Sequence, residues 1–318
     1  MVVKNNHMEP PDIESKFLGG MIGSALGDAV GELAFRYPKA PLLRSALEQA
    51  SRLCYTDDTA MAIGLAESII EKKSIDERHL GDRFRMNFER EPWRGYASGP
   101  PTIFSMVMQL GFSYSDAAKS LFKGQGSLGN GAAMRIVPVG LFFHDNPEIY
   151  NLACASARVT HAHPVGMDGA AVQALAVARA VELDPAEEFL MEVFIHNEID
   201  MARTDEIREK MVLVKGLIGS DASPESAAYR IGRSVAVHES MPFALFSFLR
   251  HYHSFEDCIY CAILNGGDRD TLGAMAGAIS GAYLGVDAIP QSWKDKLENR
   301  TYLESLARSM AKIRTGRC

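Results

Sequence analysis

Two short acidic motifs, far apart in the chain, place oxygen ligands immediately before apolar, helix-like segments. The first motif is TDDT at residues 56–59, and the second is DRDT at residues 268–271. Carboxylates gathered at one place repel one another and raise each other's pKa, so a fold that gathers four of them normally neutralises them with cations. Ligand sets made only of oxygen favour Mg²⁺, Mn²⁺ or Ca²⁺ over zinc. The two motifs therefore predict one metal site that is divided between the two ends of the chain.

Helix capping is the simpler explanation of the same residues, because Thr and Asp both make good N-caps. One such residue is enough to cap a helix. Two adjacent acids, Asp57 and Asp58, flanked by two Thr residues exceed that need, and the chemistry is repeated at residues 268–271. The partial positive charge at a helix N-terminus also helps carboxylates there to stay ionised before a metal binds. We therefore favour a metal site over capping alone.

A glycine-rich segment, GSLGNGAAMR at residues 126–135, runs into a helix-forming stretch. Loops of this kind turn successive backbone N–H groups toward an anion, and the dipole of a following helix adds to the attraction. An acidic protein would bind a pyrophosphate in this way, through its backbone. A purely structural turn explains the segment about equally well, since it matches neither the Walker pattern nor G-x-G-x-x-G.

Two further segments offer side chains for a binding cleft. His161 and His163 lie two residues apart, and the alternatives are a binding role or a histidine that caps a helix or packs in the core. A zinc site would need further thiol or imidazole ligands nearby in sequence, and none is evident. The segment WRGYASGPP at residues 93–101 either lines a substrate cleft and offers a ring to a base, or forms a surface turn.

Hydrophobic periodicity predicts helices joined by short polar or glycine-rich links through most of the chain. Sustained period-two alternation with β-branched residues is scarce, so the predicted fold class is all-α. No composition break or long linker divides the chain, and the divided metal site needs its two ends to meet. We therefore expect a single compact domain over residues 15–318, with residues 1–14 as a loosely attached tail. The predicted helices span residues 17–30, 60–71, 103–110, 150–158, 169–183, 185–195, 227–238, 243–251, 255–264, 272–284 and 292–313.

Two of the predicted helices carry glycine at every fourth position, which places the glycines on one face. Each interior glycine costs about 0.5–1 kcal/mol relative to alanine, so the pattern needs a compensating reason, and close helix contact supplies one. A membrane dimer motif is the rival explanation, but the apolar stretches are shorter than the ~20 residues that span a bilayer. We expect a central close-packed helix pair that brings Asp28 near the second acidic motif. The glycines are Gly19, Gly23, Gly27 and Gly31 in the first helix and Gly273, Gly277, Gly281 and Gly285 in the second.

The composition is that of an ordinary soluble protein, with 318 residues of which 47% are hydrophobic and 23% charged. A formal net charge of −7 argues against a broad nucleic-acid-binding surface, because phosphate backbones demand clustered Lys and Arg. The 5 cysteines show no disulfide-rich spacing, which predicts a reducing, cytoplasmic setting. Cys258 and Cys261 have apolar neighbours, so buried core cysteines explain this C-x-x-C pair better than zinc does. We expect no membrane segment, and a monomer is favoured.

Taken together, the motifs resemble the ADP-ribosylglycohydrolase family, which contains the dinitrogenase-reductase-activating glycohydrolase and the eukaryotic ADP-ribosyl-serine and ADP-ribosyl-arginine hydrolases. The resemblance rests on five segments, in order along nearly the whole chain, at residues 23–31, 55–59, 126–135, 160–161 and 266–271. Any one of them is a modest signal, whereas their joint occurrence is highly specific.

The resemblance implies an enzyme that hydrolyses the glycosidic bond at the distal ribose of ADP-ribose derivatives, with two Mg²⁺ ions, or Mn²⁺, as cofactors. In family members the metals hold the hydroxyls of that ribose, and the glycine loop cradles the phosphates. The substrate would be an ADP-ribosylated protein or an ADP-ribose derivative. The implied metal ligands are Thr56, Asp57, Asp58, Asp268, Asp270 and Thr271, and the implied substrate-binding residues are Gly99, Phe122, Gly126, Ser127, Gly129, Asn130, Gly131 and His161.

Residues 94–99, 122–126 and 242–250 resemble the serine and poly-ADP-ribose branch more than the arginine branch, which predicts that an O-linked bond is cleaved. The serine-type and nitrogenase-type members carry a glutamate seven residues after the aspartate that corresponds to Asp28, at the position where this chain has Phe35, and Glu32 is the nearest acid. Either Glu32 therefore takes the role of that glutamate, or water activation rests on Asp58 or Asp270.

Three alternatives stay open at this point. The chain could cleave ADP-ribosyl-arginine, it could bind ADP-ribose as a structural homologue without efficient turnover, or it could act on phosphate esters as a different Mg²⁺ hydrolase. Arg269 occupies the second acidic motif where small residues are usual in the family. Its side chain would either meet the phosphates or the leaving peptide, or face solvent.

Overall fold

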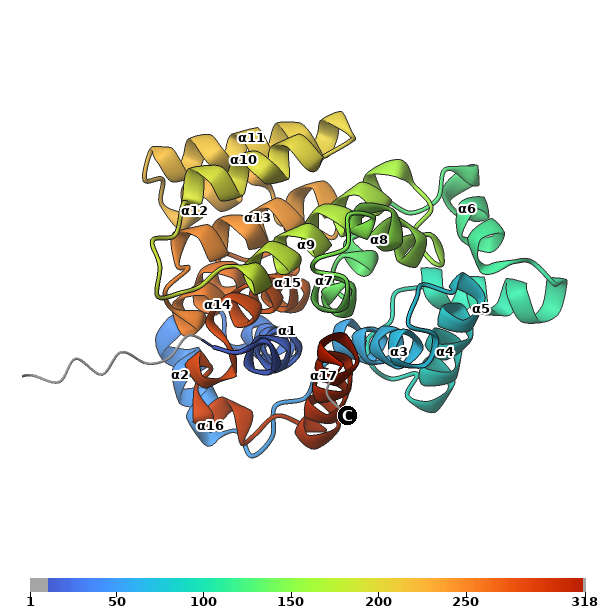
Figure 1. Ribbon diagram of the computed structural model, residues 1–318, viewed down its shortest axis with the longest axis horizontal. Coiled ribbons are helices and arrows are strands. Elements are labelled where there is room, and N and C mark those ends of the chain that lie inside the picture. The colour runs from blue at the N-terminus through green and yellow to red at the C-terminus, as the bar shows by residue number, and fades with distance from the viewer. Residues whose placement is uncertain (1–10, 317–318) are drawn as a thin grey trace, which may run out of the picture.

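Two helices pack along each other at the centre of the molecule with their backbones almost in contact (Figure 1). They are α1, Ile13–Arg36, and α15, Arg269–Leu284. A Cβ atom at Gly27 would lie 1.9 Å from the carbonyl oxygen of Gly273, and Gly19 meets Gly281 and Gly23 meets Gly277 in the same way. No side chain larger than hydrogen fits at such a distance. The predicted close-packed, glycine-faced helix pair is therefore confirmed.

The computed structural model describes residues 11–316, and the other helices surround the central pair. Helices α9, α13 and α14 pack on α15, whereas α17 packs on α1 and α3. No β-strand is present in this range, where only two isolated bridges occur, so the predicted all-α class is confirmed. The remaining helices are α2 (Ala40–Gln49), α3 (Asp57–Lys72), α4 (Glu77–Arg90), α5 (Gly99–Leu110), α6 (Tyr114–Gly124), η1 (Asn130–Ala132), α7 (Val137–Phe142), α8 (Ile149–Arg158), α9 (Pro164–Glu182), α10 (Met191–Met201), α11 (Asp205–Gly219), α12 (Pro224–Ile231), α13 (Val237–Arg250), α14 (Phe255–Leu264), η2 (Val286–Ala288), α16 (Gln291–Lys294) and α17 (Arg300–Thr315).

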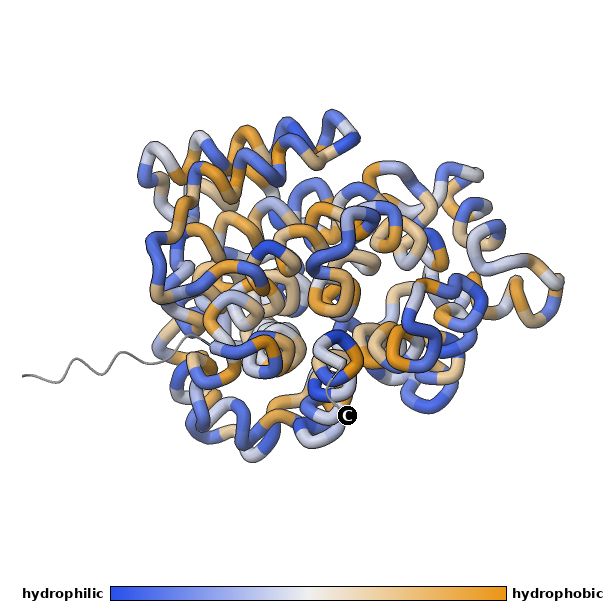
Figure 2. The backbone as a smooth tube through the Cα atoms, in the orientation of Figure 1, coloured by the Kyte–Doolittle hydropathy of each residue, from blue (hydrophilic) through white to orange (hydrophobic). Residues whose placement is uncertain are grey.

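Apolar side chains fill the space between the helices and form one contiguous core. Figure 2 shows hydrophobic segments toward the interior and hydrophilic segments at the periphery. Helices α1 and α15 are buried on nearly every side, which agrees with their apolar sequences, while α4 buries only Leu80, Gly81 and Phe84. Because the helices share one core, they form a single domain, as predicted.

Two of the predicted helices have wrong bounds because turns interrupt them. The predicted helix 185–195 begins only at Met191, since residues 184–190 form turns and irregular backbone. The predicted helix 227–238 is interrupted at Gly232, which adopts a φ of +95° and ends α12. The residues that follow Gly232 lead instead to the functional cleft described below.

A third predicted helix, 292–313, is in fact two helices. Helix α16 ends at Lys294, and Asn299 has a φ of +56°, a left-handed conformation that a helix interior does not adopt, so α17 starts at the next residue. Five helices were not predicted, namely α2, α4, α6, α7 and α11. Of these, α4 is mostly charged and α7 has only 6 residues, so neither offers a long apolar stripe.

Three expectations about the chain's ends and surface can be compared with the structure. Most of the predicted tail, residues 1–14, lies outside the described residues, but its last part is wrong, because Asp12 caps α1 by accepting the N–H of Ser15 at 2.8 Å. Cys258 and Cys261 are free and buried in α14, as predicted. Among the described helices, none combines the length and the apolar character needed to cross a bilayer.

We expect Gly277→Ala to destabilise the protein by about 3 kcal/mol or more, because its methyl carbon would lie 2.2 Å from the carbonyl oxygen of Gly23. Gly216 in α11 provides the control, since nothing lies within 4 Å of its Cβ position. Gly216→Ala should stabilise the protein by about 0.5–1 kcal/mol. Urea unfolding measures both effects, and equal stability of the two variants would contradict the interlocked helix pair.

Candidate active site

A cleft of about 610 Å³ brings the two acidic motifs together. Its wall includes the start of α3, the loop before α5, the glycine-rich segment, residues 160–163, residues 235–236 and the start of α15. Asp57, Asp58, Asp268, Asp270 and Thr271 all line the cleft, so the two ends of the chain do meet there. The predicted substrate-binding residues that line it are Gly99, Phe122, Gly126, Ser127, Gly129, Asn130, Gly131 and His161. Thr56 and Glu32 lie outside this wall.

Asp28, in the second half of α1, holds the first acidic motif in place. Its carboxylate accepts the backbone N–H of Thr56 at 3.0 Å, and both the N–H and the hydroxyl of Thr59 at 3.1 and 2.6 Å. Burial raises the pKa of Asp28 to about 6, although these hydrogen bonds from Thr59 and Thr56 favour the charged form. Thr56 itself caps α3 by accepting the N–H of Asp58 at 3.4 Å. The same turn therefore both caps α3 and carries the residues of the first acidic motif.

The second acidic motif is held by the contact between α1 and α15 and by one amide. A Cβ atom at Gly31 would lie 2.6 Å from the Cα atom of Asp270, so this motif abuts the same end of α1 that carries Asp28. The predicted approach of Asp28 to this turn is confirmed. In addition, the Nδ2 atom of Asn130 donates to Asp268 at 2.7 Å. Asn130 thus joins the glycine-rich segment to an acid of the opposite wall.

The carboxyl groups of the cleft raise one another's pKa. Burial raises the pKa of Asp57 to about 7, and the charge of Asp28 adds to this. Burial also raises the pKa of Asp270 to about 8, with the charges of Asp268 and Asp28 as further causes. The pKa of the buried Asp58 lies well above its ordinary value, because burial and all of these neighbouring charges oppose its ionisation. The carboxylates of the cluster therefore have too little positive charge nearby to balance their mutual repulsion.

The donor set fits hard divalent cations. The Oδ2 atom of Asp58 is buried and has no hydrogen-bond partner within the described residues. A buried, unpaired carboxylate oxygen is costly, and a cation relieves that cost. Between residues 11 and 316, no three Asp, Glu, His or Cys side chains converge as they would around an ion held by protein alone. Mg²⁺ commonly takes one or two carboxylates, several waters and substrate oxygens, and the cleft offers donors of this kind.

The glycine-rich segment forms the wall opposite the acids, but it is not followed by a long helix. It contains η1, a single 3₁₀ turn, and then leads into α7, so the predicted following helix is present but has only 6 residues. The first turn of a longer helix, the 19-residue α9, packs directly against the segment instead. A Cβ atom at Gly166 in that turn would lie 2.5 Å from the carbonyl oxygen of Ser127. Gly126 adopts a φ of +75° and packs against the backbone of His163. The segment is thus shaped by tertiary packing.

His161 is held as a neutral hydrogen-bond donor. Arg135, fully buried, donates to the hydroxyl of Thr160 at 2.7 Å, and that hydroxyl lies 2.8 Å from Nδ1 of His161. The hydroxyl has no other partner among the described residues, so its hydrogen points to Nδ1 and the imidazole proton lies on Nε2. A Cβ atom at Gly131 would lie 3.0 Å from Nε2. Burial, with the nearby charge of Arg135, lowers the pKa of His161 to about 3.

The cleft has an apolar rim that the sequence indicates only in part. Phe122 lines the cleft with 64% of its surface exposed, and its φ of +52° is rare for an aromatic residue. Gly95 and residues 97–100 line the cleft as one alternative predicted, but the ring that this alternative offers to a base is missing, because Trp93 and Tyr96 both lie outside the cleft wall. Leu128 and Val235 were not predicted as cleft residues. No feature of the sequence indicates that Val235 lines the cleft, because its position there depends on the break in the chain after α12.

Three residues around the acidic cluster complete the comparison with the sequence. Glu32 is exposed and outside the cleft wall, although its charge contributes, after burial and nearer acids, to the raised pKa of Asp270. Phe35 is 49% exposed. Arg269 does not line the cleft, because its Nη1 atom donates to the carbonyl oxygen of Ile263 in the last turn of α14.

Known proteins match this sequence over nearly its whole length. The family model for ADP-ribosylglycohydrolase matches residues 9–318. A protein of Bos taurus named ADP-ribosylhydrolase ARH3 is 31% identical, covering 94% of this chain and 93% of its own. The Danio rerio protein of the same name is 32% identical, with 93% and 90% covered.

More distant similarities agree with this result. ADP-ribosyl-[dinitrogen reductase] glycohydrolase of Rhodospirillum rubrum is 26% identical over 93% of this chain and 95% of its own. A solved structure described as an ADP-ribosylglycohydrolase-related protein complex has the same fold, with a TM-score of 0.66, 23% identity and coverage of 95% and 98%. The chain therefore belongs to the ADP-ribosylglycohydrolase family and is an enzyme of the glycoside hydrolase type.

Proposed function

We propose that this protein is a Mg²⁺-dependent ADP-ribosyl hydrolase that cleaves an O-linked bond at the distal ribose and releases ADP-ribose. The substrate would be ADP-ribosyl-serine in a protein, poly-ADP-ribose or O-acetyl-ADP-ribose. The observation that carries the proposal is that both acidic motifs and the glycine-rich segment line one cleft. The identity of 31–32% to proteins named ADP-ribosylhydrolase ARH3 favours this branch over the dinitrogen reductase type at 26%.

The acidic wall would hold two Mg²⁺ ions, or Mn²⁺ in their place. Ions bound there would neutralise the carboxylates and polarise the ribose hydroxyls as Lewis acids. The raised pKa values of Asp57 and Asp270 and the unpaired oxygen of Asp58 support this assignment. The ligands would be Thr56, Asp57, Asp58, Asp268, Asp270 and Thr271.

The opposite wall would hold the ADP part of the ligand. The Nε2–H group of His161 is a neutral donor beside the glycine-rich segment and suits a phosphate or ribose oxygen. The exposed ring of Phe122 suits stacking on a base. Backbone N–H groups of the segment at residues 126–131 would add donors without adding net charge.

Asp58 and Asp270 would act on the reacting carbon. Hydrolysis at an anomeric carbon passes through a state that resembles an oxocarbenium ion, and carboxylates nearby stabilise its positive charge. Either carboxylate would also accept the proton of the attacking water. Glu32 was assigned the same role from the sequence, but its exposed position outside the cleft wall makes the two aspartates the better candidates.

A second candidate function is ADP-ribose binding with little turnover, and the position of Glu32 outside the cleft wall favours it. The arginine-linked substrate is a further alternative that the substrate panel below separates. We also propose a monomer in a reducing, cytoplasmic setting, since the four cysteines that the structure describes are all free.

The first test is a substrate panel. Peptide carrying ADP-ribosyl-serine or ADP-ribosyl-arginine, poly-ADP-ribose and O-acetyl-ADP-ribose are incubated with the enzyme, with Mg²⁺ or with EDTA, and the products are identified by mass spectrometry. We expect ADP-ribose from an O-linked substrate only with Mg²⁺, and none from Asp270→Ala. No release from any substrate, together with tight ADP-ribose binding in calorimetry, would establish the binding function instead.

The second test uses pH and metal removal. Carboxyl groups with raised pKa stabilise the fold at low pH, and this contribution is lost as the pH rises from the ordinary value of 3.8 through about 7 and about 8. Metal-free protein should therefore lose thermal stability between these limits, and Mg²⁺ should restore it most at high pH.

Asp58→Asn removes one buried charge from the same cluster. At pH 8 we expect a higher melting temperature than wild type in EDTA, but a smaller increase on adding Mg²⁺. Asp205→Asn is the control, because that side chain is 86% exposed and outside the cleft. A lower melting temperature of Asp58→Asn in EDTA would show that repulsion in the cluster is not what limits stability.

The third test concerns Glu32. Removing a general base lowers kcat by about 10²- to 10⁴-fold. We expect no loss of that size in Glu32→Gln under saturating substrate and Mg²⁺, because the residue lies outside the cleft wall. A loss in that range with unchanged ADP-ribose binding would transfer the base role from the aspartates to Glu32.

A further inference from the structure

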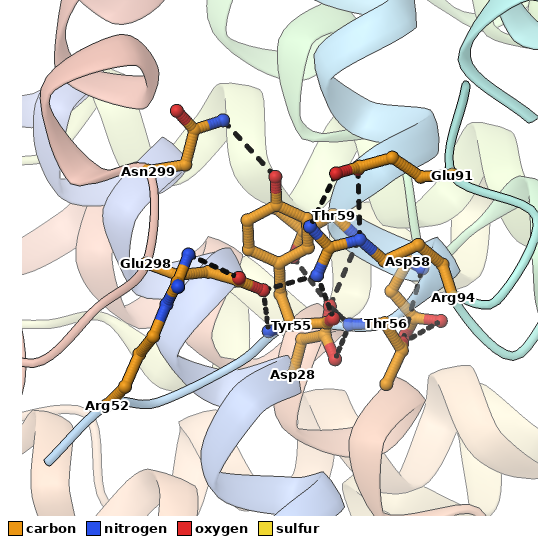
Figure 3. A network of polar contacts seen from close by, with 10 residues as sticks. All are labelled: Asp28, Arg52, Tyr55, Thr56, Asp58, Thr59, Glu91, Arg94, Glu298 and Asn299. Carbon is orange, nitrogen blue, oxygen red and sulfur yellow. Dashed lines mark hydrogen bonds and ion pairs between the residues drawn. The ribbon is translucent and has the colours of Figure 1, made fainter.

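Arg94 joins segments of the chain that are remote in sequence (Figure 3). Its guanidinium lies over the ring of Tyr55, 4.1 Å from the ring centroid. Its Nη1 atom donates to the carbonyl oxygen of Tyr55 at 3.0 Å and also to the carboxylate of Glu298. Its Nε and Nη2 atoms donate to the two carboxylate oxygens of Glu91 at 3.0 and 3.1 Å. Four of the five guanidinium hydrogens are therefore engaged.

The partners of Arg94 are themselves fixed. The side chain of Glu298 is 5% exposed, and its Oε1 atom accepts the backbone N–H of Tyr55 at 2.8 Å. The amide of Asn299 donates to the hydroxyl of Tyr55 at 3.2 Å. Residues just before α17 thus form a rigid base for Tyr55, which directly precedes the first acidic motif.

The segment that follows Arg94 has little support of its own. All of residues 95–100 except Tyr96 line the cleft, and the Cβ position of Gly95 lies 3.7 Å from Oδ1 of Asp57. Within the described chain, no hydrogen bond attaches residues 95–97 to any other part of the protein. Besides the two ends, the ring of Tyr96 restrains them, because it packs against the hydrophobic core and lies edge-on to Phe88 with centroids 5.1 Å apart.

We propose that Arg94 is a positioning residue that holds the cleft wall at residues 95–100 against the first acidic motif. The planar guanidinium reaches Glu91, Tyr55 and Glu298 at once, which a single ammonium group does not do. The proposal goes beyond the proposed function but rests on it for the ligand, because a displaced wall would weaken the binding of ADP-ribose.

The chain offers a matched control at Arg52. Arg52 pairs with the same carboxylate, Glu298, at 3.0 Å, but its side chain is 62% exposed and no hydrogen bond joins it to the cleft wall. Removing this exposed partner tests the loss of an ion pair with Glu298 alone. Removing Arg94 tests the same loss together with the contacts to Glu91 and Tyr55.

The first readout needs no ligand. Chymotrypsin is applied to the native protein, and cleavage after Tyr96 is followed by mass spectrometry. We expect Arg94→Lys to increase this rate on the order of tenfold, because the wall opens more often, while Arg52→Ala leaves it unchanged. Should Arg94→Lys fail to fold, Glu91→Gln loosens the same end of the wall through a side chain that is 32% exposed.

The second readout is calorimetry of ADP-ribose with Mg²⁺ and steady-state kinetics on the substrate found above. We expect Arg94→Lys to lose on the order of 10²-fold in kcat/KM, with weaker ADP-ribose binding, because a small displacement of a positioning group has such effects. Arg52→Ala should match wild type. Absence of ADP-ribose binding by wild type would refute the proposed function, while the cleavage rate after Tyr96 still decides the role of Arg94. Wild-type cleavage rates in both Arg94→Lys and Glu91→Gln would overturn the positioning role.

Discussion

The backbone contact between α1 and α15 decides where every acid of the cleft lies. At Gly27 and Gly273 the two helices approach so closely that no Cβ atom fits between them. This contact sets the end of α1, with Asp28, beside the start of α15, with Asp270. Because Asp28 also accepts hydrogen bonds from the turn before α3, the first acidic motif is fixed to the same point. A looser helix pair would separate the two halves of the site.

Gathering these acids opposes folding, and the protein offsets that cost in an uneven way. Asp28 is fully satisfied by N–H and hydroxyl donors, and Asp268 is satisfied in part by Asn130. Asp58 keeps a buried oxygen without a partner in the described structure. An unpaired buried acceptor destabilises the native state, and a cation beside Asp58 would offset that cost. The difference in hydrogen bonding thus distinguishes Asp28, which holds the site together, from Asp58, which keeps an oxygen free for a ligand.

The opposite wall is built without exposed positive charge. Arg135, the last residue of the glycine-rich segment, is buried, and it acts on the cleft through Thr160, which fixes the tautomer of His161. In the proposed function, neutral donors of this kind would suit a diphosphate whose charge is also balanced by cations on the acidic wall, because a second set of cations would compete for the same charge. The arrangement agrees with a chain whose net charge is −7. Arg94 has the corresponding structural task on the third side of the cleft, through Tyr55 and Glu298.

The sequence by itself determined the helical class, the glycine-faced pair and the identity of the acids, because each depends on a local pattern or a residue type. Gly27 and Asp58 belong to this group. The exposed place of Glu32, the tautomer of His161, the arrival of Val235 at the cleft and the anchoring of Arg94 on Glu298 were decided only by the tertiary structure. Each of these depends on a contact between segments that no local pattern records, so the energy that fixes it appears only once the chain has folded.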